Sequence, residues 1–525
     1  MSATQQHPLI DALRRPEAWA GLGPVPQRVE LIETHISCIF LLDGLAYKLK
    51  KPLDLGFLDF STPEKRRFCC EEELRLNRRL AADVYLQVLP ICGSEESPEP
   101  GGSGEPFDWL LQMRRFDAEG VLAERPERLA PELVRQIIGQ IARFHAAAAP
   151  LEPDQPYGRP ERVLHPMQEN FTQLRQFTQE PELLRPLVEL EAWTLERFER
   201  LRPLLEQRRE QGHIRECHGD LHLGNMVLEA ERPIIFDGIE FNPALRWIDC
   251  LNDLAFLLMD LRHQGRADLA HLALDEYLQQ SGDFAGVPLL DFYQCYRALV
   301  RAKVSAIRLS QAELDQASRQ SIQRDCLAYI QLAAEFTRPQ RGALLISHGL
   351  SGSGKSHIGR QLFGPLPLIR LRSDVERKRL AGLAPDQRTA SDLNVGLYSP
   401  QMTRRTFDHL AQLTESLLGC DQLLLIDATF LKASVRQRFR QLAEGLGVAF
   451  YILEFQRSPQ QLAQNIQRRL AKGLDASDAD FGVLQQQLQQ DEPLSAEEQA
   501  LSIPVPLDGV EGLLTELRRR LRLPQ

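Results

Sequence analysis

Apolar runs on either side of a tight turn characterise the first part of the chain. Residues 38–44 (CIFLLDG) and 45–51 (LAYKLKK) meet at an Asp-Gly pair, a combination that predicts a β-hairpin. Residues 63–80 carry apolar side chains at helical spacing among many charges, which predicts a helix. The acidic, Gly- and Pro-rich stretch 93–106 predicts a solvated loop between strands. This part of the chain therefore predicts several strands accompanied by one helix.

The middle of the chain has mainly helical periodicity. From Pro131 onward, apolar residues fall on one face of a predicted helix: Val134, Ile137, Ile138, Ile141 and Phe144. Helical patterns continue to about residue 211. A compact Gly-containing segment then occupies residues 218–253, and helices resume to about residue 336.

The pattern changes after residue 336. Residues 337–342 (TRPQRG) are polar and contain Pro and Gly, which predicts a linker between domains. Beyond it, short runs rich in Leu, Ile and Val alternate with helical stretches, a pattern typical of a parallel sheet covered by helices on both faces. Because we find no internal repeat, the sequence predicts two different folds, over residues 1–336 and 343–525.

Composition narrows the class of protein. A chain of 525 residues is too long for one core. Its apolar fraction of 43% and charged fraction of 26% are ordinary for globular proteins. No apolar run approaches the roughly 18 residues of a membrane span, and the N-terminus lacks the pattern of a signal peptide. We therefore expect a cytoplasmic protein with no membrane partner.

The net charge and the spacing of the cysteines argue against two further classes, general nucleic-acid binders and zinc-binding proteins. The net charge of −10 argues against general nucleic-acid binding, although a single nucleic-acid end stays open as a substrate. The nine cysteines have no zinc-like spacing. We interpret them as buried reduced thiols.

A phosphate-binding loop is encoded in the C-terminal half. Residues 349–356 (GLSGSGKS) fit G-x-x-x-x-G-K-[ST] between a predicted strand and a predicted helix. Glycines let backbone N–H groups turn inward around phosphate oxygens, and the helix N-terminus adds positive charge. We expect ATP and Mg²⁺ as ligands, with Lys355 on the β- and γ-phosphates and Ser356 on the metal. The predicted nucleotide-binding residues are Gly349, Ser351, Gly352, Ser353, Gly354, Lys355 and Ser356.

Two acidic positions supplement this loop. Asp427 ends the apolar run QLLLID, a place that suits a carboxylate for Mg²⁺ or for orienting a nucleophile. Asp374 opens a predicted helix, where it either caps the helix or accepts the proton of an acceptor hydroxyl. Arg377 shares its helix face, so a base beside an arginine that holds an anionic group is the predicted pairing.

The C-terminal half resembles the P-loop small-molecule and polynucleotide-5′-kinase group, which includes gluconate kinase, chloramphenicol phosphotransferase and zeta-toxin-like enzymes. The resemblance rests on GLSGSGKS, on Asp374 and Arg377, on LLIDATF (residues 424–430) and on QRRLAKG (residues 467–473). It implies an α/β P-loop NTPase domain with a lid arginine. Arg468 or Arg469 would supply that arginine, and we assign it to Arg469. Family members often carry arginines four apart on this helix, whereas this chain has Asn465.

A second constellation lies in the N-terminal half. HGDLHLGN (residues 218–225) is followed by FDG (residues 236–238) after a short hairpin pattern. An Asp and an Asn five apart, then a second Asp, match the needs of phosphoryl transfer. Asp220 is predicted to accept or orient the acceptor hydroxyl, and Asn225 and Asp237 to hold Mg²⁺. We interpret His218 and His222 as residues that pack the loop.

Residues from about 30 to 336 resemble the aminoglycoside phosphotransferase and choline-kinase branch of the protein-kinase-like fold, which carries H-G-D in place of H-R-D. The resemblance implies an α+β bilobal domain in which Asp249 and Asp253 anchor the larger lobe. It also implies a strand lysine for the phosphates, assigned to Lys48, which alternates with Lys50 along the strand. The helix glutamate that holds this lysine lies among residues 71–73, and we favour Glu73.

The whole arrangement resembles a bacterial family described as a bifunctional or AAA-type ATPase. We expect two ATP-dependent transfers to hydroxyl groups of small molecules. One domain serving as a nucleotide-dependent module for the other, and phosphorylation of nucleic-acid 5′ ends by the second domain, are the alternatives. The sequence leaves the oligomeric state open.

Overall fold

The computed structural model describes residues 8–523 except 55, 57, 179, 311–313, 340, 385–386, 388–396, 398, 473–480 and 507–508. The chain divides into two compact units. Unit 1 contains residues 1–172 and 202–260, and unit 2 contains residues 173–201 and 261–525.

Unit 1 is built on a six-stranded antiparallel sheet of order β1-β2-β3-β6-β4-β5. Its strands are β1 Glu30–Glu33, β2 Ser37–Leu42, β3 Leu45–Lys50, β4 Tyr85–Gly93, β5 Pro98–Pro100 and β6 Asp108–Arg114. The predicted hairpin is confirmed, because β2 and β3 pair across a turn in which Asp43 has φ of 40°. Strand β5 corrects the prediction of a plain loop over residues 93–106. It lies at the sheet edge, where the missing N–H of proline is tolerated.

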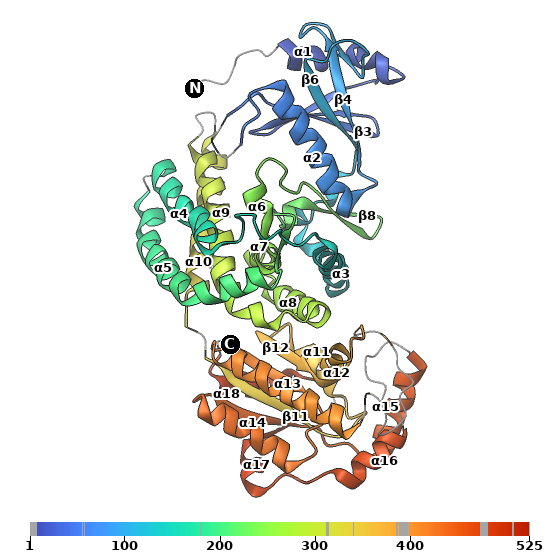
Figure 1. The fold of residues 1–525 in the computed structure, drawn as a ribbon, viewed down its shortest axis with the longest axis vertical. Helices are drawn as coiled ribbons and strands as arrows, with labels where there is room; N and C mark the ends of the chain where they lie inside the picture. The colour runs from blue at the N-terminus through green and yellow to red at the C-terminus, as the bar shows by residue number, and fades with distance from the viewer. Residues whose placement is uncertain are drawn as a thin grey trace. The chain divides into compact units, whose positions relative to one another are not determined.

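The predicted helix after this hairpin is α2, Pro63–Ala81. Its N-terminus is fixed by Thr62, whose side chain accepts a hydrogen bond from the Lys65 N–H, and by Pro63 in the first turn. The helix packs against β4 and β6 (Figure 1). It buries Cys70 and Leu76. Helix α2 therefore lies across the face of the sheet from which the side chains of Lys48 and Lys50 project.

The remainder of unit 1 supports two short ribbons that carry the motif residues. β7 Ile214–Glu216 pairs with β10 Trp247–Asp249, and β8 Met226–Glu229 pairs with β9 Arg232–Ile235. The helices of this unit after the first sheet are α3 Pro131–Ala147 and α6 Pro243–Arg246. Three further helices contain residues of both units: α4 Pro160–Phe177, α5 Pro181–Glu210 and α7 Cys250–His263. HGDLHLGN connects β7 to β8, and FDG follows β9.

Unit 2 contains a five-stranded parallel sheet of order β12-β13-β11-β14-β15, as the alternating pattern predicted. Its strands are β11 Ala343–His348, β12 Leu368–Arg372, β13 Leu423–Asp427, β14 Ala449–Glu454 and β15 Ser502–Pro504. Its helices are α8 Ala267–Ser281, α9 Leu290–Leu309, α10 Gln316–Phe336, α11 Lys355–Leu362, α12 Ser373–Leu380, α13 Pro400–Leu418, α14 Ala433–Gly445, α15 Pro459–Lys472, α16 Phe481–Gln490, α17 Ala496–Leu501 and α18 Glu511–Leu521. Helices α11 and α18 pack on one face of the sheet, while α13 and α14 contact β13 and β14.

The edge strand β12 is covered by α8. The side chains of Arg370 and Asp275 are both buried and form an ion pair of 2.6 Å. Gln279 on the same helix donates to the Arg370 carbonyl at 3.0 Å, and Arg379 donates to the Gln279 carbonyl at 2.7 Å. The predicted linker at 337–342 lies between α10 and β11, yet contacts group residues 261–336 with the sheet. The domain limits therefore stay a prediction.

We expect Asp275→Ala to lower the free energy of unfolding by about 3–5 kcal/mol, because it leaves a buried guanidinium without a counter-charge. Urea unfolding of the full chain measures this. The exposed Asp408, which pairs with Arg438, offers a matched control, and Asp408→Ala should cost less than about 1 kcal/mol. Asp275→Leu combined with Arg370→Met should recover most of the stability. An Asp275→Ala variant as stable as the control would contradict the prediction.

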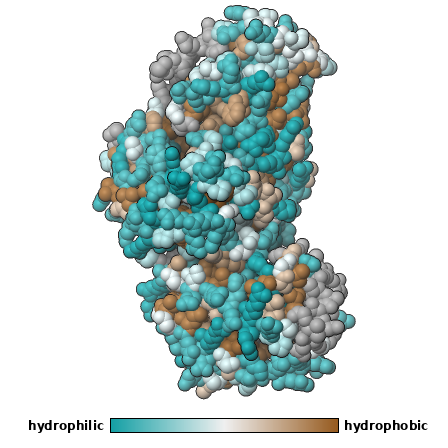
Figure 2. Space-filling view, viewed as in Figure 1, coloured by the Kyte–Doolittle hydropathy of each residue, from teal (hydrophilic) through white to brown (hydrophobic). Residues whose placement is uncertain are grey.

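The face of the molecule drawn in Figure 2 is mainly hydrophilic. On the face shown in Figure 2, hydrophilic residues predominate and hydrophobic residues form scattered small patches. No helix in the described part of the chain is both long and apolar enough to cross a membrane. All nine cysteines are free thiols, and eight of them are buried.

Candidate active sites

The first site begins with a lysine pair on β3. Alternation along a strand turns Lys48 and Lys50 to the same side, where α2 presents Glu73. The Nζ atom of Lys48 donates to Glu73 Oε1 at 2.8 Å, and that of Lys50 donates to Glu73 Oε2 at 2.6 Å. Burial raises the pKa of the fully buried Glu73 carboxyl, but the two lysines outweigh this and lower it to about 2. Glu73 is therefore ionised and holds both lysines.

The other two glutamates of the run have different partners. Glu71 is exposed and pairs with Arg67 at 2.9 Å. Glu72 pairs with Arg75 at 2.8 Å and with Arg246 at 3.0 Å. Of the three alternatives left by the sequence, Glu73 is the one that the structure places on Lys48.

Asp237, two residues after the end of β9, lies beside this lysine pair. Its backbone has φ of 61°, and its N–H donates to the hydroxyl of Tyr85 at 3.0 Å. The neighbouring Gly238 N–H donates to Asn77 Oδ1 on α2 at 2.8 Å. These bonds direct the Asp237 carboxylate to Lys48 Nζ, 2.8 Å away, while 45% of the side chain stays exposed. A half-exposed carboxylate beside a lysine is available to a metal and to phosphate groups.

The HGDLHLGN loop brings Asp220 and Asn225 together. The Nδ2 atom of Asn225 donates to Asp220 Oδ2 at 2.9 Å and to the Asp220 carbonyl at 3.0 Å. His222 Nε2 lies 3.3 Å from the same carboxylate oxygen, and its Nδ1 accepts from the Gly224 N–H. His218 is buried against the Phe236 carbonyl, and burial lowers its pKa, so it packs the loop as a neutral imidazole.

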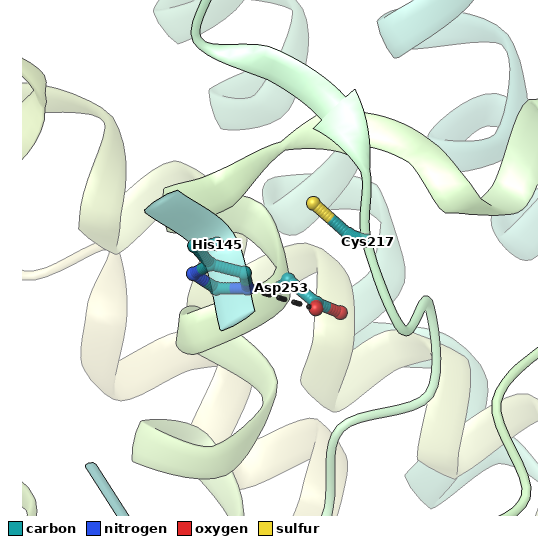
Figure 3. Close-up of side chains that lie close together, drawn as sticks. All are labelled: His145, Cys217 and Asp253. Carbon is teal, nitrogen blue, oxygen red and sulfur yellow. Dashed lines mark hydrogen bonds and ion pairs between the residues drawn. The ribbon is translucent and has the colours of Figure 1, made fainter. Parts of the chain in front are cut away.

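Asp253 on α7 anchors this loop. Its carboxylate accepts hydrogen bonds from the His218 and Gly219 N–H groups, both at 2.9 Å. Figure 3 shows His145 of α3 reaching the same carboxylate, at 3.1 Å, with Cys217 beside the pair. The donor atoms of these three buried side chains lie within 4.8 Å of one another. Because the carboxylate is already held by backbone N–H groups, we interpret the cluster as a structural support for the loop.

Two further carboxylates fix the surroundings of the loop. Asp249 forms a buried ion pair with Arg208 at 2.6 Å. Asp260 accepts from the Leu223 N–H at 2.8 Å. Asp260 was not predicted from the sequence, and neither was Glu240, which pairs with Lys50. Neither residue lies in a recognisable motif, and only the fold brings them to the loop and to the lysine pair.

The second site is the loop between β11 and α11. Gly349, Gly352 and Gly354 have φ of 153°, 84° and 93°, a region that favours glycine. At Gly352 a Cβ atom would lie 2.8 Å from the Leu462 carbonyl, so α15 approaches the loop closely. Lys355 begins α11 and donates from Nζ to the Gly349 and Leu350 carbonyls, both at 2.8 Å. Ser356 follows it in the first helical turn.

Asp427 ends β13 opposite Arg372 of β12. Its side chain is buried, and Oδ2 has no hydrogen-bond partner among the described residues. Burial raises the pKa of this carboxyl. An orphaned buried carboxylate oxygen near the phosphate loop fits the oxygen preference of Mg²⁺. Asp427 and Ser356 are the groups that would hold the ion.

Asp374 and Arg377 on α12 have separate partners. Asp374 pairs with Arg372 at 2.7 Å and accepts from the Val375 N–H at 2.9 Å. Burial raises its pKa, but Arg372 outweighs this and lowers it. Arg377 donates to the Leu397 carbonyl and to the Thr403 hydroxyl, both at 2.9 Å. Asp374 therefore stays ionised, while Arg377 contacts the start of α13.

Helices α15 and α16 contact the phosphate loop directly. Asn465 donates to the Gly352 carbonyl at 2.9 Å, and Gln487 accepts from the Ser351 N–H at 2.8 Å. The Asn465 position, which departs from the family pattern, thus binds the loop itself. Arg468 is exposed on α15, and the side chain of Arg469 lies outside the described residues.

We expect Asp427→Asn to raise the Mg²⁺ concentration for half-maximal nucleotide binding in the second domain by roughly 10-fold or more. The same change should raise the melting temperature at neutral pH, because it removes a buried carboxylate whose Oδ2 has no hydrogen-bond partner among the described residues. The pKa of Asp427 is raised in the folded protein, so the stability advantage of Asp427→Asn is complete at a pH above that folded-state pKa. Below the pKa of the unfolded chain the Asp427 carboxyl is protonated in both states, and the advantage disappears. Fluorescence titration and a thermal melt measure both effects. If Asp427→Asn lowers the melting temperature and leaves the Mg²⁺ dependence unchanged, Asp427 has only a structural role.

Two family models match separate parts of the chain. Residues 64–292 match the model of a phosphotransferase enzyme family, and residues 344–494 match the model of an AAA domain. Uncharacterized proteins of Mycobacterium tuberculosis and Mycobacterium bovis are 29% identical over 454 residues, which cover 86% of this chain and 88% of theirs.

Solved structures with similarity include kinases of both types. An amicoumacin kinase in complex with AMP-PNP, Ca²⁺ and its ligand is 12% identical, covers 58% of this chain and 89% of its own, and has a TM-score of 0.38. A gluconokinase from Sinorhizobium meliloti is 19% identical, covers 35% of this chain and 94% of its own, and has a TM-score of 0.25. The chain carries two kinase-like domains, one of the phosphotransferase type and one of the P-loop type.

Proposed function

We propose that the chain is an ATP-dependent phosphotransferase with two nucleotide sites, each of which transfers a γ-phosphoryl group to a hydroxyl of a small molecule. The observation that carries the proposal is the position of Lys48, whose Nζ lies 2.8 Å from both Glu73 and Asp237. A lysine held by a buried glutamate and set beside a metal-binding aspartate is the arrangement that positions ATP phosphates in kinases. Because ATP is the donor, the proposal places the protein in the cytoplasm.

In the first domain the roles follow from charge and exposure. Asn225 and Asp237 would hold Mg²⁺, which supplies positive charge to the phosphate oxygens. Lys48 exchanges Asp237 for a phosphate oxygen and keeps its bond to Glu73. Asp220 accepts the proton of the acceptor hydroxyl, while Asn225 Nδ2 orients its carboxylate.

In the second domain Lys355 exchanges the loop carbonyls for phosphate oxygens. Backbone N–H groups of the loop and the N-terminus of α11 bind the same phosphates. Asp374, ionised beside Arg372, is the base for the acceptor hydroxyl. Asp427 and Ser356 would hold the metal, and Arg469 is the lid arginine in this proposal.

A nucleotide-dependent switch is a second candidate for the P-loop domain. The contacts that favour it are those of Asn465 and Gln487, which join α15 and α16 to the backbone of the loop. Phosphate binding at the Ser351 N–H would displace Gln487. The binding energy of the nucleotide would then move α15 and α16 instead of driving phosphoryl transfer.

The test is transfer of labelled γ-phosphate from ATP with Mg²⁺, using the full chain. Acceptors are sugars, amino alcohols, aminoglycosides and an oligonucleotide with a free 5′-hydroxyl. We expect ADP formation that a small-molecule acceptor stimulates, together with a labelled product. Labelling of the oligonucleotide alone would assign the second domain to nucleic-acid ends. Absence of both ATP binding and turnover would contradict the proposal.

A further inference from the structure

Lys50 is a buried lysine beside the first site. It lies on β3 two residues after Lys48, and only 1% of its side chain is exposed. Its Nζ atom contacts Glu73 Oε2 at 2.6 Å and Glu240 Oε1, and it lies 4.8 Å from the centre of the Phe60 ring. A buried ammonium group is costly unless carboxylates pair with it. The chain supplies two such carboxylates from distant segments, which indicates a specific use for this charge.

The charges around Lys48 explain that use. Lys48 also faces two carboxylates, those of Glu73 and Asp237. To bind a phosphate, Lys48 has to release Asp237. The positive charge of Lys48 is then shared between the phosphate and Glu73. Lys50 neutralises the second oxygen of Glu73. Glu73 is therefore still paired when Lys48 turns to the nucleotide.

Lys50 also joins α2 to the segment that carries Asp237. Glu240 lies three residues after Asp237, so the bridge from Glu73 through Lys50 to Glu240 spans the two elements. Three contacts run beside it: Asn77 accepts from the Gly238 N–H, and Arg246 pairs with Glu72 while donating to the Glu240 carbonyl. The helix and the metal-binding segment are thereby held in one arrangement.

We propose that Lys50 is a positioning residue of the first site, which with Glu240 fixes Glu73 and the Asp237 segment so that Lys48 can exchange Asp237 for a nucleotide phosphate. This role rests on the proposed function of the first domain. It differs from the role of Lys48, because Lys50 is buried among the two carboxylates and acts on the nucleotide through Lys48.

The test uses the full chain carrying Lys355→Ala, so that the second site does not contribute, with a fluorescent ATP analogue and Mg²⁺ as the probe. We expect Lys50→Met to weaken Mg²⁺-dependent binding by roughly 10-fold or more. Lys51→Met is the matched control, because Lys51 is the next lysine and pairs at the surface with Glu33. It should leave binding unchanged.

A double variant separates positioning from stability. Lys50→Met with Glu240→Gln removes both buried charges, so we expect the melting temperature to recover towards that of the parent. Nucleotide binding should stay weak, because Glu73 then has only Lys48 as a partner. Binding restored to the parent value in the double variant, or unchanged in Lys50→Met, would overturn the proposal. If Lys48→Met also binds as the parent does, the proposed function of the first domain fails instead.

Discussion

Replacing Asp220 by alanine should lower phosphoryl transfer by the first domain ~10²- to 10⁴-fold, the contribution typical of a general base. The fold should tolerate the change. The Asp220 side chain is 34% exposed, and the loop around it is held by other groups, among them the Asp253 carboxylate on the His218 and Gly219 N–H groups. The measurements are kcat for the acceptor found in the screen and the melting temperature, both in the full chain carrying Lys355→Ala.

Asp253→Ala provides the contrast, because it removes the anchor of the loop instead of its reacting group. We expect it to lower stability, since two buried backbone N–H groups lose their acceptor. Asp220→Asn keeps the shape of the side chain and removes the charge, so its kcat should fall as in Asp220→Ala. A kcat that stays near the parent value in both Asp220 variants would exclude this residue as the base.

Local patterns predicted the elements that short-range forces determine. The hairpin of β2 and β3 follows from alternation around an Asp-Gly turn, and α2 follows from helical spacing behind the cap at Thr62. The glycine-rich loop was predictable because the requirement for positive φ limits three of its positions to glycine. In each case the determining residues lie close together in the sequence.

Pairings between distant segments could not be predicted in the same way. Arg370 and Asp275 are 95 residues apart, and Lys50 and Glu240 are 190 apart. Periodicity shows that a helix has a buried face, but it does not show which strand that face meets. The strand β15 and the contacts of Asn465 and Gln487 with the loop depend on tertiary packing as well. Motifs were sufficient to name candidate site residues, whereas the residues that hold those candidates in place mostly lie outside any motif.

Replacing Lys355 by alanine should lower ATP turnover by the second domain ~10²- to 10³-fold or more, because a positive charge directed at the transferred phosphate is lost. Its ammonium group lies over the loop, bonded to the Gly349 and Leu350 carbonyls, where a phosphate would attract it. Turnover is measured in the full chain carrying Asp220→Ala, which leaves the second domain as the active one.

Lys432→Ala is the control for this change, because Lys432 is an exposed lysine of the same unit that pairs with Glu492. It should leave turnover near the parent value. Unchanged turnover in Lys355→Ala would exclude the assigned role of the loop lysine. If Lys355→Ala, without the Asp220 change, also removes transfer by the first domain, the P-loop domain controls the first domain through its nucleotide. If first-domain transfer persists, the two sites work independently and acceptors can be sought for each in turn.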